Sequence, residues 1–145
     1  MNKLTLAQIE ELILLHYNIK AEITPLAGEV DYNYHLKTSD HREYLLKISR
    51  PYTPLQSIDF PTKILQHLAT QTLVFDIPQI VHNKAGNAYV EIEQEQYLRL
   101  QAWVSGNMVG DWKRRSPELL QSWGETTAQL CQALQNFDHS EAHRF

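Results

Sequence analysis

The sequence predicts an α+β fold, in which a five-stranded, mainly antiparallel sheet packs against one helix. A second helix is expected at the N-terminus and a long one at the C-terminus. Apolar residues recur at helical spacing near both ends of the chain, over 6–17 and 116–137. Between them lie short segments that alternate apolar and polar residues and are separated by turn-forming residues, which is typical of hairpins.

The N-terminal helix is expected to begin at Thr5, because Gln8 follows three residues later and completes a capping box. Residues 20–26 are expected to be extended, since Pro25 disfavours helical backbone in the residue before it. The next two segments, 33–38 and 43–49, predict two antiparallel strands joined by a four-residue turn.

The central helix is predicted over 59–70, with Asp59 as a plausible cap and Pro61 in the first turn, where a missing N–H costs nothing. Ile64, Leu65 and Leu68 are expected to face inward. The segments 79–82 and 88–92 predict a second hairpin around the turn-forming residues between them.

The fifth strand is expected from Tyr97 to Val104. Ser116 and Pro117 are a strong helix start, and the apolar face that follows reaches Phe137. The basic run 113–115 before this helix is expected to be a solvated loop.

Composition excludes several classes of protein. The chain has 145 residues, 43% hydrophobic and 21% charged, as in ordinary globular domains. A net charge of −4 argues against a general nucleic-acid binder. The single cysteine, Cys131, excludes a disulfide framework and fits the cytoplasm. No apolar run approaches the ~20 residues that span a bilayer, so no membrane partner is expected.

Four segments, taken in order, resemble one known family. They are the first hairpin 26–36, the strand 43–51 with Lys47, the hinge-like segment 99–106 and the closing segment 136–144. This order resembles the N-terminal lobe of the aminoglycoside phosphotransferase (APH) and hydroxylysine kinase-like family, whose fold is protein-kinase-like. The branch in question is sometimes fused to class III aminotransferases.

The resemblance implies a division of the chain. Residues 1–104 would form the kinase-like N-terminal lobe, and 105–145 the hinge and first helix leading to a C-terminal lobe. The family's catalytic loop and metal-binding aspartate belong to that second lobe, and neither motif occurs here. The chain is therefore expected to be part of a longer protein, and to be inactive when isolated.

Lys47 is the first candidate for nucleotide binding, because an ammonium on a rigid strand can hold nucleotide phosphates. Leu45 shares its strand face and is expected to pack on the base. In the kinase fold a helix carboxylate usually pairs with this lysine. Asp59 is the sole carboxylate in the matching stretch, near the predicted helix cap, so the partner of Lys47 stays open.

The other candidates are expected above the phosphates and at the hinge. Glycine allows close approach of the backbone to phosphate, and the hinge would read the base edge through main-chain groups. The remaining candidate nucleotide-binding residues are Gly28, Glu29, Asp31 and Asn33 in the loop, and Ala102, Trp103 and Val104 at the hinge.

The sequence thus predicts the nucleotide-binding lobe of a small-molecule phosphotransferase, which uses ATP or GTP with Mg²⁺ on the hydroxyl of an amino alcohol or amino acid. The alternative is a non-catalytic, pseudokinase-like interaction module fused to another enzyme, such as an aminotransferase. Neither the phosphate acceptor nor the choice between ATP and GTP follows from the sequence.

Two further expectations concern metal and partners. His139 and His143 share a helical spacing, but the sequence offers no third ligand, so we expect no metal site here. The apolar face of the 116–137 helix would be covered by the second lobe in a complete kinase. In the isolated chain a homodimer is the favoured alternative.

Overall fold

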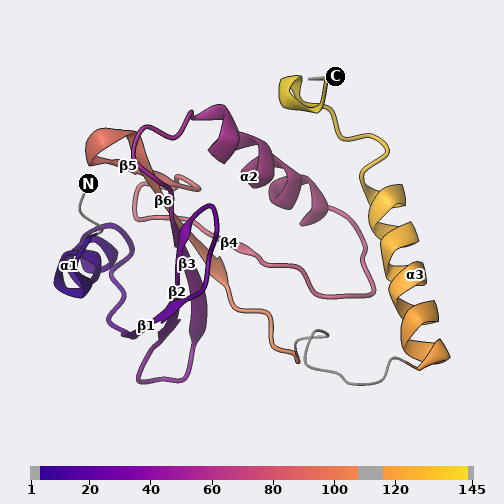
Figure 1. The fold of residues 1–145 in the computed structure, drawn as a ribbon, viewed down its shortest axis with the longest axis horizontal. Helices are drawn as coiled ribbons and strands as arrows, with labels where there is room; N and C mark the ends of the chain where they lie inside the picture. Colours follow the sequence, from indigo (N-terminus) through magenta and orange to yellow (C-terminus); the bar gives the residue numbers. More distant parts are fainter. Residues whose placement is uncertain (1–3, 108–115, 144–145) are drawn as a thin grey trace.

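The computed structural model describes residues 4–107 and 116–143. The basic run 113–115 and Arg144 of the closing segment lie outside the described residues. Figure 1 shows a central sheet with α1 on one side and α2 on the other, while α3 stands beyond α2, away from the sheet. The element order is α1 (Leu6–Tyr17), β1 (Glu22–Leu26), β2 (Tyr32–Lys37), β3 (Glu43–Ile48), α2 (Gln56–Leu68), β4 (Ile80–Val81), β5 (Val90–Ile92), β6 (Gln96–Ala102) and α3 (Pro117–Ala133).

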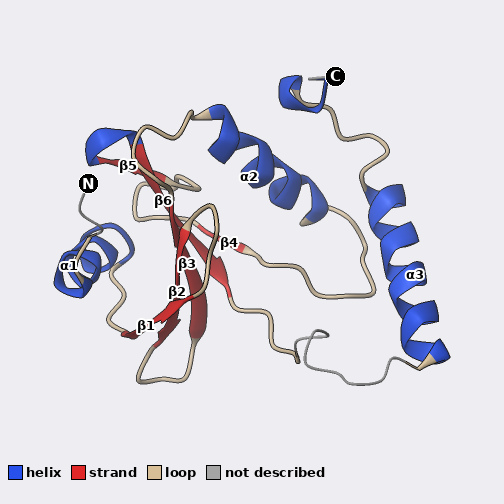
Figure 2. Cartoon of the chain, viewed as in Figure 1, coloured by secondary structure: helices blue, strands red, loops and turns tan. Residues whose placement is uncertain are grey.

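The sheet has six strands in the described part of the chain, not the predicted five, and every pairing is antiparallel (Figure 2). The extra strand is β1, inside the segment that was predicted only to be extended; it pairs with β2 along its whole length. The β2–β3 hairpin confirms the prediction, with Asn33 opposite Lys47. The α+β class and the kinase-like arrangement are also confirmed.

The predicted hairpin of 79–82 with 88–92 is wrong. Both segments pair with β6 instead: Val81 lies opposite Leu100, and Val90 lies opposite Leu98. Since β3 occupies the other edge of β6, β4 and β5 lie end to end along one edge and cannot pair with each other.

The core lies between α1 and the even-numbered face of the sheet. Side chains alternate between the two faces of a strand, so one set of positions from four strands, β2, β3, β5 and β6, meets the apolar stripe of the helix. The predicted capping box is present, with Gln8 N–H donating to Thr5 Oγ1. The buried residues are Ile9, Ile13 and Tyr17 from α1, and Tyr34, Leu36, Tyr44, Leu46, Ile48, Val90, Leu98 and Leu100 from the sheet. The odd-numbered positions of β2, β3 and β6 therefore lie on the opposite face.

The central helix begins three residues earlier than predicted, at Gln56, and ends at Leu68. The N–H groups of Ser57 and Ile58 bond to the carbonyls of Pro54 and Leu55, forming an opening turn without a side-chain cap. Pro61 therefore lies inside the helix rather than in its first turn. The inward side consists of Ile58, Thr62 and Leu68, while Ile64 and Leu65 are half-buried.

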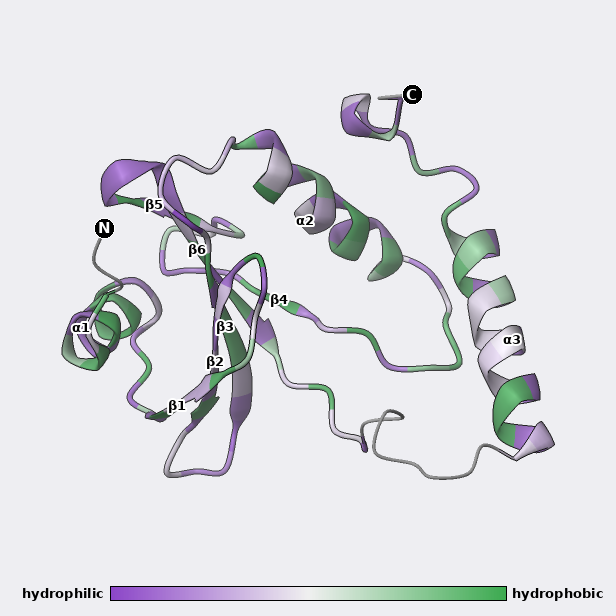
Figure 3. Ribbon diagram, in the orientation of Figure 1, coloured by the Kyte–Doolittle hydropathy of each residue, from purple (hydrophilic) through white to green (hydrophobic). Residues whose placement is uncertain are grey.

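The C-terminal helix α3 begins at the predicted cap, where Ser116 Oγ accepts from the N–H of Leu119. It ends at Ala133, earlier than the predicted Phe137. The following segment folds back on α2: the Phe137 ring lies 6.1 Å from that of Phe60. No residue of α3 is buried in the described structure, and Figure 3 shows apolar residues at both of its ends.

No helix in the described ranges combines the length and apolar character needed to cross a membrane.

Candidate functional site

Three charged side chains meet on the odd-numbered face of the sheet. Lys47 in β3 lies directly opposite Arg99 in β6, and Asp31 precedes β2 on the other side of Lys47. One carboxylate oxygen, Asp31 Oδ2, lies 2.6 Å from Arg99 Nη2 and 3.3 Å from Lys47 Nζ. Asp31 therefore pairs with both cations at once, and the cluster has a formal charge of +1.

Two members of the cluster are buried, and the third, Lys47, is partly exposed to solvent. Asp31 and Arg99 are 8% and 6% exposed, whereas the Lys47 side chain is 28% exposed. Burial lowers the pKa of the Arg99 guanidinium below its usual value, and the neighbouring Asp31 carboxylate opposes that effect. Lys47 is thus the cation that can reach a ligand, with the other two groups behind it.

The partner of Lys47, which the sequence left open, is Asp31 rather than a residue of the central helix. Asp59 in α2 is engaged elsewhere, since its Oδ2 lies 3.2 Å from His139 Nε2. Asp31 was predicted as part of the loop over the phosphates. It does lie in that loop, but its carboxylate contacts the two cations of the cluster.

The loop between β1 and β2 turns tightly at Gly28, close to Asp31 and Asn33. A Cβ atom at this position would collide with the side-chain nitrogen of Asn33 and the carbonyl of Asp31, so only glycine allows this approach. Asn33 Nδ2 also donates to the carbonyl of Ala27, at 3.3 Å. Glu29, by contrast, is exposed and was not found with the cluster.

A second row of side chains lies next to the charged row on the same face. Leu45 lies opposite His35 in β2 and Gln101 in β6. His35 Nε2 lies 2.6 Å from Glu43 Oε2, and its ring centroid lies 4.4 Å from that of Trp103. A row of mixed character, in which Leu45 and the rings of His35 and Trp103 lie beside the polar Gln101 and Glu43, therefore continues from Lys47 to the end of β6.

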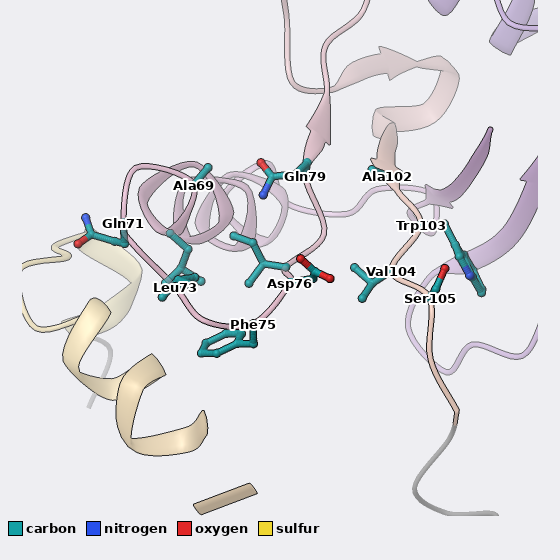
Figure 4. Close-up of a pocket in the computed structure, with 12 residues that line it drawn as sticks. Ala69, Gln71, Leu73, Phe75, Asp76, Gln79, Ala102, Trp103, Val104 and Ser105 are labelled. Atoms are coloured by element: carbon teal, nitrogen blue, oxygen red, sulfur yellow. The ribbon is translucent and has the colours of Figure 1, made fainter. Parts of the chain in front are cut away.

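Of the predicted hinge residues, Ala102 is the last residue of β6, which ends two residues before the predicted Val104. Trp103 and Val104 follow it directly, and their side chains point in opposite directions. In Figure 4 the Val104 side chain points toward Asp76, whereas the Trp103 indole lies on the other side of the chain. The N–H of Ala102 donates to the carbonyl of Gln79 at 2.8 Å, and that of Trp103 to Glu43 at 3.1 Å.

All three hinge residues border a pocket of about 440 Å³. The pocket is walled on its other sides by the end of α2 and the segment 71–79. It does not include Lys47. The predicted site residues thus fall in two places: Gly28, Asp31, Asn33 and Lys47 at the charged cluster, and the hinge beyond the Leu45 row.

Arg99 was missed as a site residue. One signal was available: it is the only charge in the apolar strand from Tyr97 to Ala102. In an antiparallel pair its position opposite Lys47 follows once the register is known, but the register was not predictable from strand pattern alone.

The two C-terminal histidines have other partners. His139 lies beside Asp59, and His143 Nε2 lies 2.6 Å from Asp138 Oδ1. No group of three potential metal-ligating side chains gathers among residues 4–107 and 116–143.

Comparison with known proteins gives a family match. The sequence model of the family described as "Phosphotransferase enzyme family" (APH) matches residues 22–145. No curated protein matches the sequence.

Solved structures share the fold. An amicoumacin kinase, solved with AMP-PNP, Ca²⁺ and Ami, has a TM-score of 0.75 and 18% identity; the match covers 94% of this chain and 42% of that one. A microcompartment-associated aminopropanol kinase has a TM-score of 0.71 and 19% identity, covering 96% and 44%. A spectinomycin phosphotransferase, solved with ADP and spectinomycin, has a TM-score of 0.60 and 13% identity, covering 96% and 50%. The chain therefore spans half or less of the length of these structures.

Proposed function

Because the chain belongs to the phosphotransferase enzyme family, we propose that it is the nucleotide-binding lobe of a small-molecule kinase. Residues 1–104 would form this lobe, and 105–145 the hinge and first helix of a second lobe. The phosphate donor would be ATP or GTP, and the acceptor a hydroxyl of an amino alcohol or amino acid. The related structures with AMP-PNP and ADP support a nucleotide as ligand.

The observation that carries the proposal is the position of Lys47. Its ammonium is held by a buried carboxylate, yet remains partly exposed on the face that continues to the hinge. Phosphoryl transfer depends on positioning and charge stabilisation more than on covalent chemistry. A cation that is fixed on a strand beside a close-packed glycine loop can orient phosphate groups in this way.

The base would lie one or two rows away on the same face. Each step of two residues along a strand covers about 6.8 Å, so Leu45 is one step and the Trp103 row two steps from Lys47. His35 and Trp103 offer ring surfaces there. Since the N–H groups of Ala102 and Trp103 are used within the sheet, the remaining main-chain groups of the hinge would contact the base edge.

Magnesium would neutralise charge on the phosphates when it is bound. Asp31 is a poor ligand for it, because both cations of the cluster compete for that carboxylate. In this proposal the metal ligands and the general base belong to the second lobe, as the family resemblance implies. We therefore expect the 145-residue chain alone to transfer no phosphate.

The test is calorimetric titration of the full-length protein with Mg-ATP and Mg-GTP. Lys47→Met should weaken binding by about 10–100-fold, because a charged contact to phosphate contributes about 1.5–3 kcal/mol. Lys63→Met, at an exposed position on α2, is the control and should bind as the wild type does. Equal affinity of the wild type and Lys47→Met, with matching circular dichroism, would contradict the proposal and favour a non-catalytic interaction module.

A further inference from the structure

Arg99 is a buried charge in the middle of the sheet, and stability does not explain it. Its side chain is 7% exposed, and its Nε has no hydrogen-bond partner among the described residues. Leaving a buried charged donor unsatisfied costs free energy that an apolar residue would not. A role in function would explain an arginine there.

The contacts of Arg99 show what it acts on. Its Nη2 donates to the same carboxylate oxygen that lies 3.3 Å from Lys47 Nζ. In the kinase fold a helix carboxylate usually pairs with the strand lysine. Here Asp59 of the central helix contacts His139 instead, and Asp31 is the carboxylate that pairs with Lys47. Any change at Arg99 must therefore alter the charge that Asp31 presents to Lys47.

We propose that Arg99 is a positioning residue that acts through Asp31 to keep the Lys47 ammonium available for nucleotide phosphates. This inference rests on the proposed function, because it assumes that Lys47 binds phosphate. Without Arg99, the buried Asp31 would have Lys47 as its one cationic partner in the cluster. The carboxylate and the phosphates would then compete for a single ammonium.

Arginine suits this task for two reasons. Its guanidinium remains charged in proteins and holds a carboxylate in a fixed geometry. It also brings the cluster to a formal charge of +1, so an anion can approach although Asp31 is present. The β1–β2 loop has a separate arginine contact, because Arg50 Nε donates to the carbonyl of Val30 at 3.1 Å. Among the described residues, Arg50 shows no interaction with the Asp31 carboxylate.

The experiment compares binding of Mg-ADP and of adenosine, which lacks phosphate, by calorimetry on the full-length protein. Arg99→Met should weaken ADP binding at least about tenfold and leave adenosine binding within about twofold. Arg50→Met is the matched control: it removes an arginine that holds the same loop, and should change the ratio of the two affinities little.

A double-mutant cycle separates indirect from direct action. In an Asp31→Asn background, Arg99→Met should cause little further loss of ADP affinity, because its effect passes through Asp31. A full loss in that background would make Arg99 a direct phosphate ligand and overturn the proposal. Equal losses for ADP and adenosine would show a merely structural role and overturn it too.

The two proposals fail in different ways. If Lys47→Met loses ADP affinity while Arg99→Met keeps it, the positioning role is wrong and the nucleotide site stands. If Lys47→Met binds ADP as the wild type does, the nucleotide site is wrong, and the role of Arg99 falls with it.

Discussion

Lys47 and Arg99 are charged residues in strands that are otherwise largely apolar. The Asp31 carboxylate pairs with both of them. The sequence predicts Lys47 and Asp31 as site residues, since one is a charge in mid-strand and the other follows a glycine loop. It does not predict that they touch. That contact depends on the register of β2, β3 and β6, which side-chain packing in the core decides.

Tyr17 provides a test of the core that is independent of function. Its hydroxyl is buried and has no partner in the described part of the structure, and burial raises its pKa to about 12. The unfolded chain loses this proton near pH 10, so between about pH 10 and 12 the unfolded state binds fewer protons than the folded one. Stability should therefore fall with rising pH in that window.

Tyr17→Phe should remove this alkaline loss, which is about 2–3 kcal/mol over the whole window, and leave stability at pH 7 unchanged or slightly higher. Urea denaturation between pH 7 and 11.5 measures it, with the exposed Tyr52→Phe as control. An alkaline slope as steep in Tyr17→Phe as in the wild type would mean that the hydroxyl is not buried in the folded protein.

The elements divide into those with strong local signals and those without. The capping box at Thr5 and the cap at Ser116 define where the two terminal helices, α1 and α3, begin. The start of α2 was predicted late because Leu55 offers no capping side chain. Strands β4 and β5 are only two and three residues long. They pair with β6 on the edge that β3 leaves open. A local sequence pattern does not indicate which edge is open.

The β1–β2 loop makes a prediction at this scale. Gly28→Ala would push a methyl group into Asn33 and the Asp31 carbonyl. Overpacking of this kind costs about 1–3 kcal/mol, and the displaced loop should also weaken nucleotide binding. Gly124→Ala is the control, since a Cβ there meets open space and a helix favours alanine by about 1 kcal/mol.

Urea denaturation and nucleotide titration of both variants give the result. We expect Gly28→Ala to lose stability and affinity, and Gly124→Ala to gain stability with its affinity unchanged. Normal affinity in Gly28→Ala would show that the loop does not approach the phosphates.

For the molecule as a whole, α3 differs from α1 and α2 because none of its described residues is buried. Leu120 and Trp123 are 52% and 54% exposed, whereas Ala133 and Phe137 contact His67 and Phe60 of α2. The chain spans half or less of the solved structures that share its fold, and in our proposal a second lobe covers this helix. Exposed apolar faces of this kind tend to become interfaces.

We therefore expect the isolated 145-residue chain to associate, with a symmetric dimer favoured because two-fold pairing buries the same patch twice. Light scattering over a concentration series measures this. Trp123→Glu should shift the chain toward monomer, whereas Glu125→Gln, at another exposed position of α3, should not. A monomer at all concentrations in the wild type would show that α3 needs no further cover.

The central claim is that the face carrying Lys47 binds nucleotide phosphates. An acyl-phosphate derivative of ATP tests it most directly, because such a probe transfers its acyl group to an amine beside the phosphates. The full-length protein is labelled, digested and mapped by mass spectrometry, with and without excess ADP. The account predicts that Lys47 is labelled and that ADP protects it, while Lys37, Lys63 and Lys84 react weakly and without regard to ADP. Labelling spread evenly over these lysines, or labelling of Lys47 that ADP does not reduce, would contradict it.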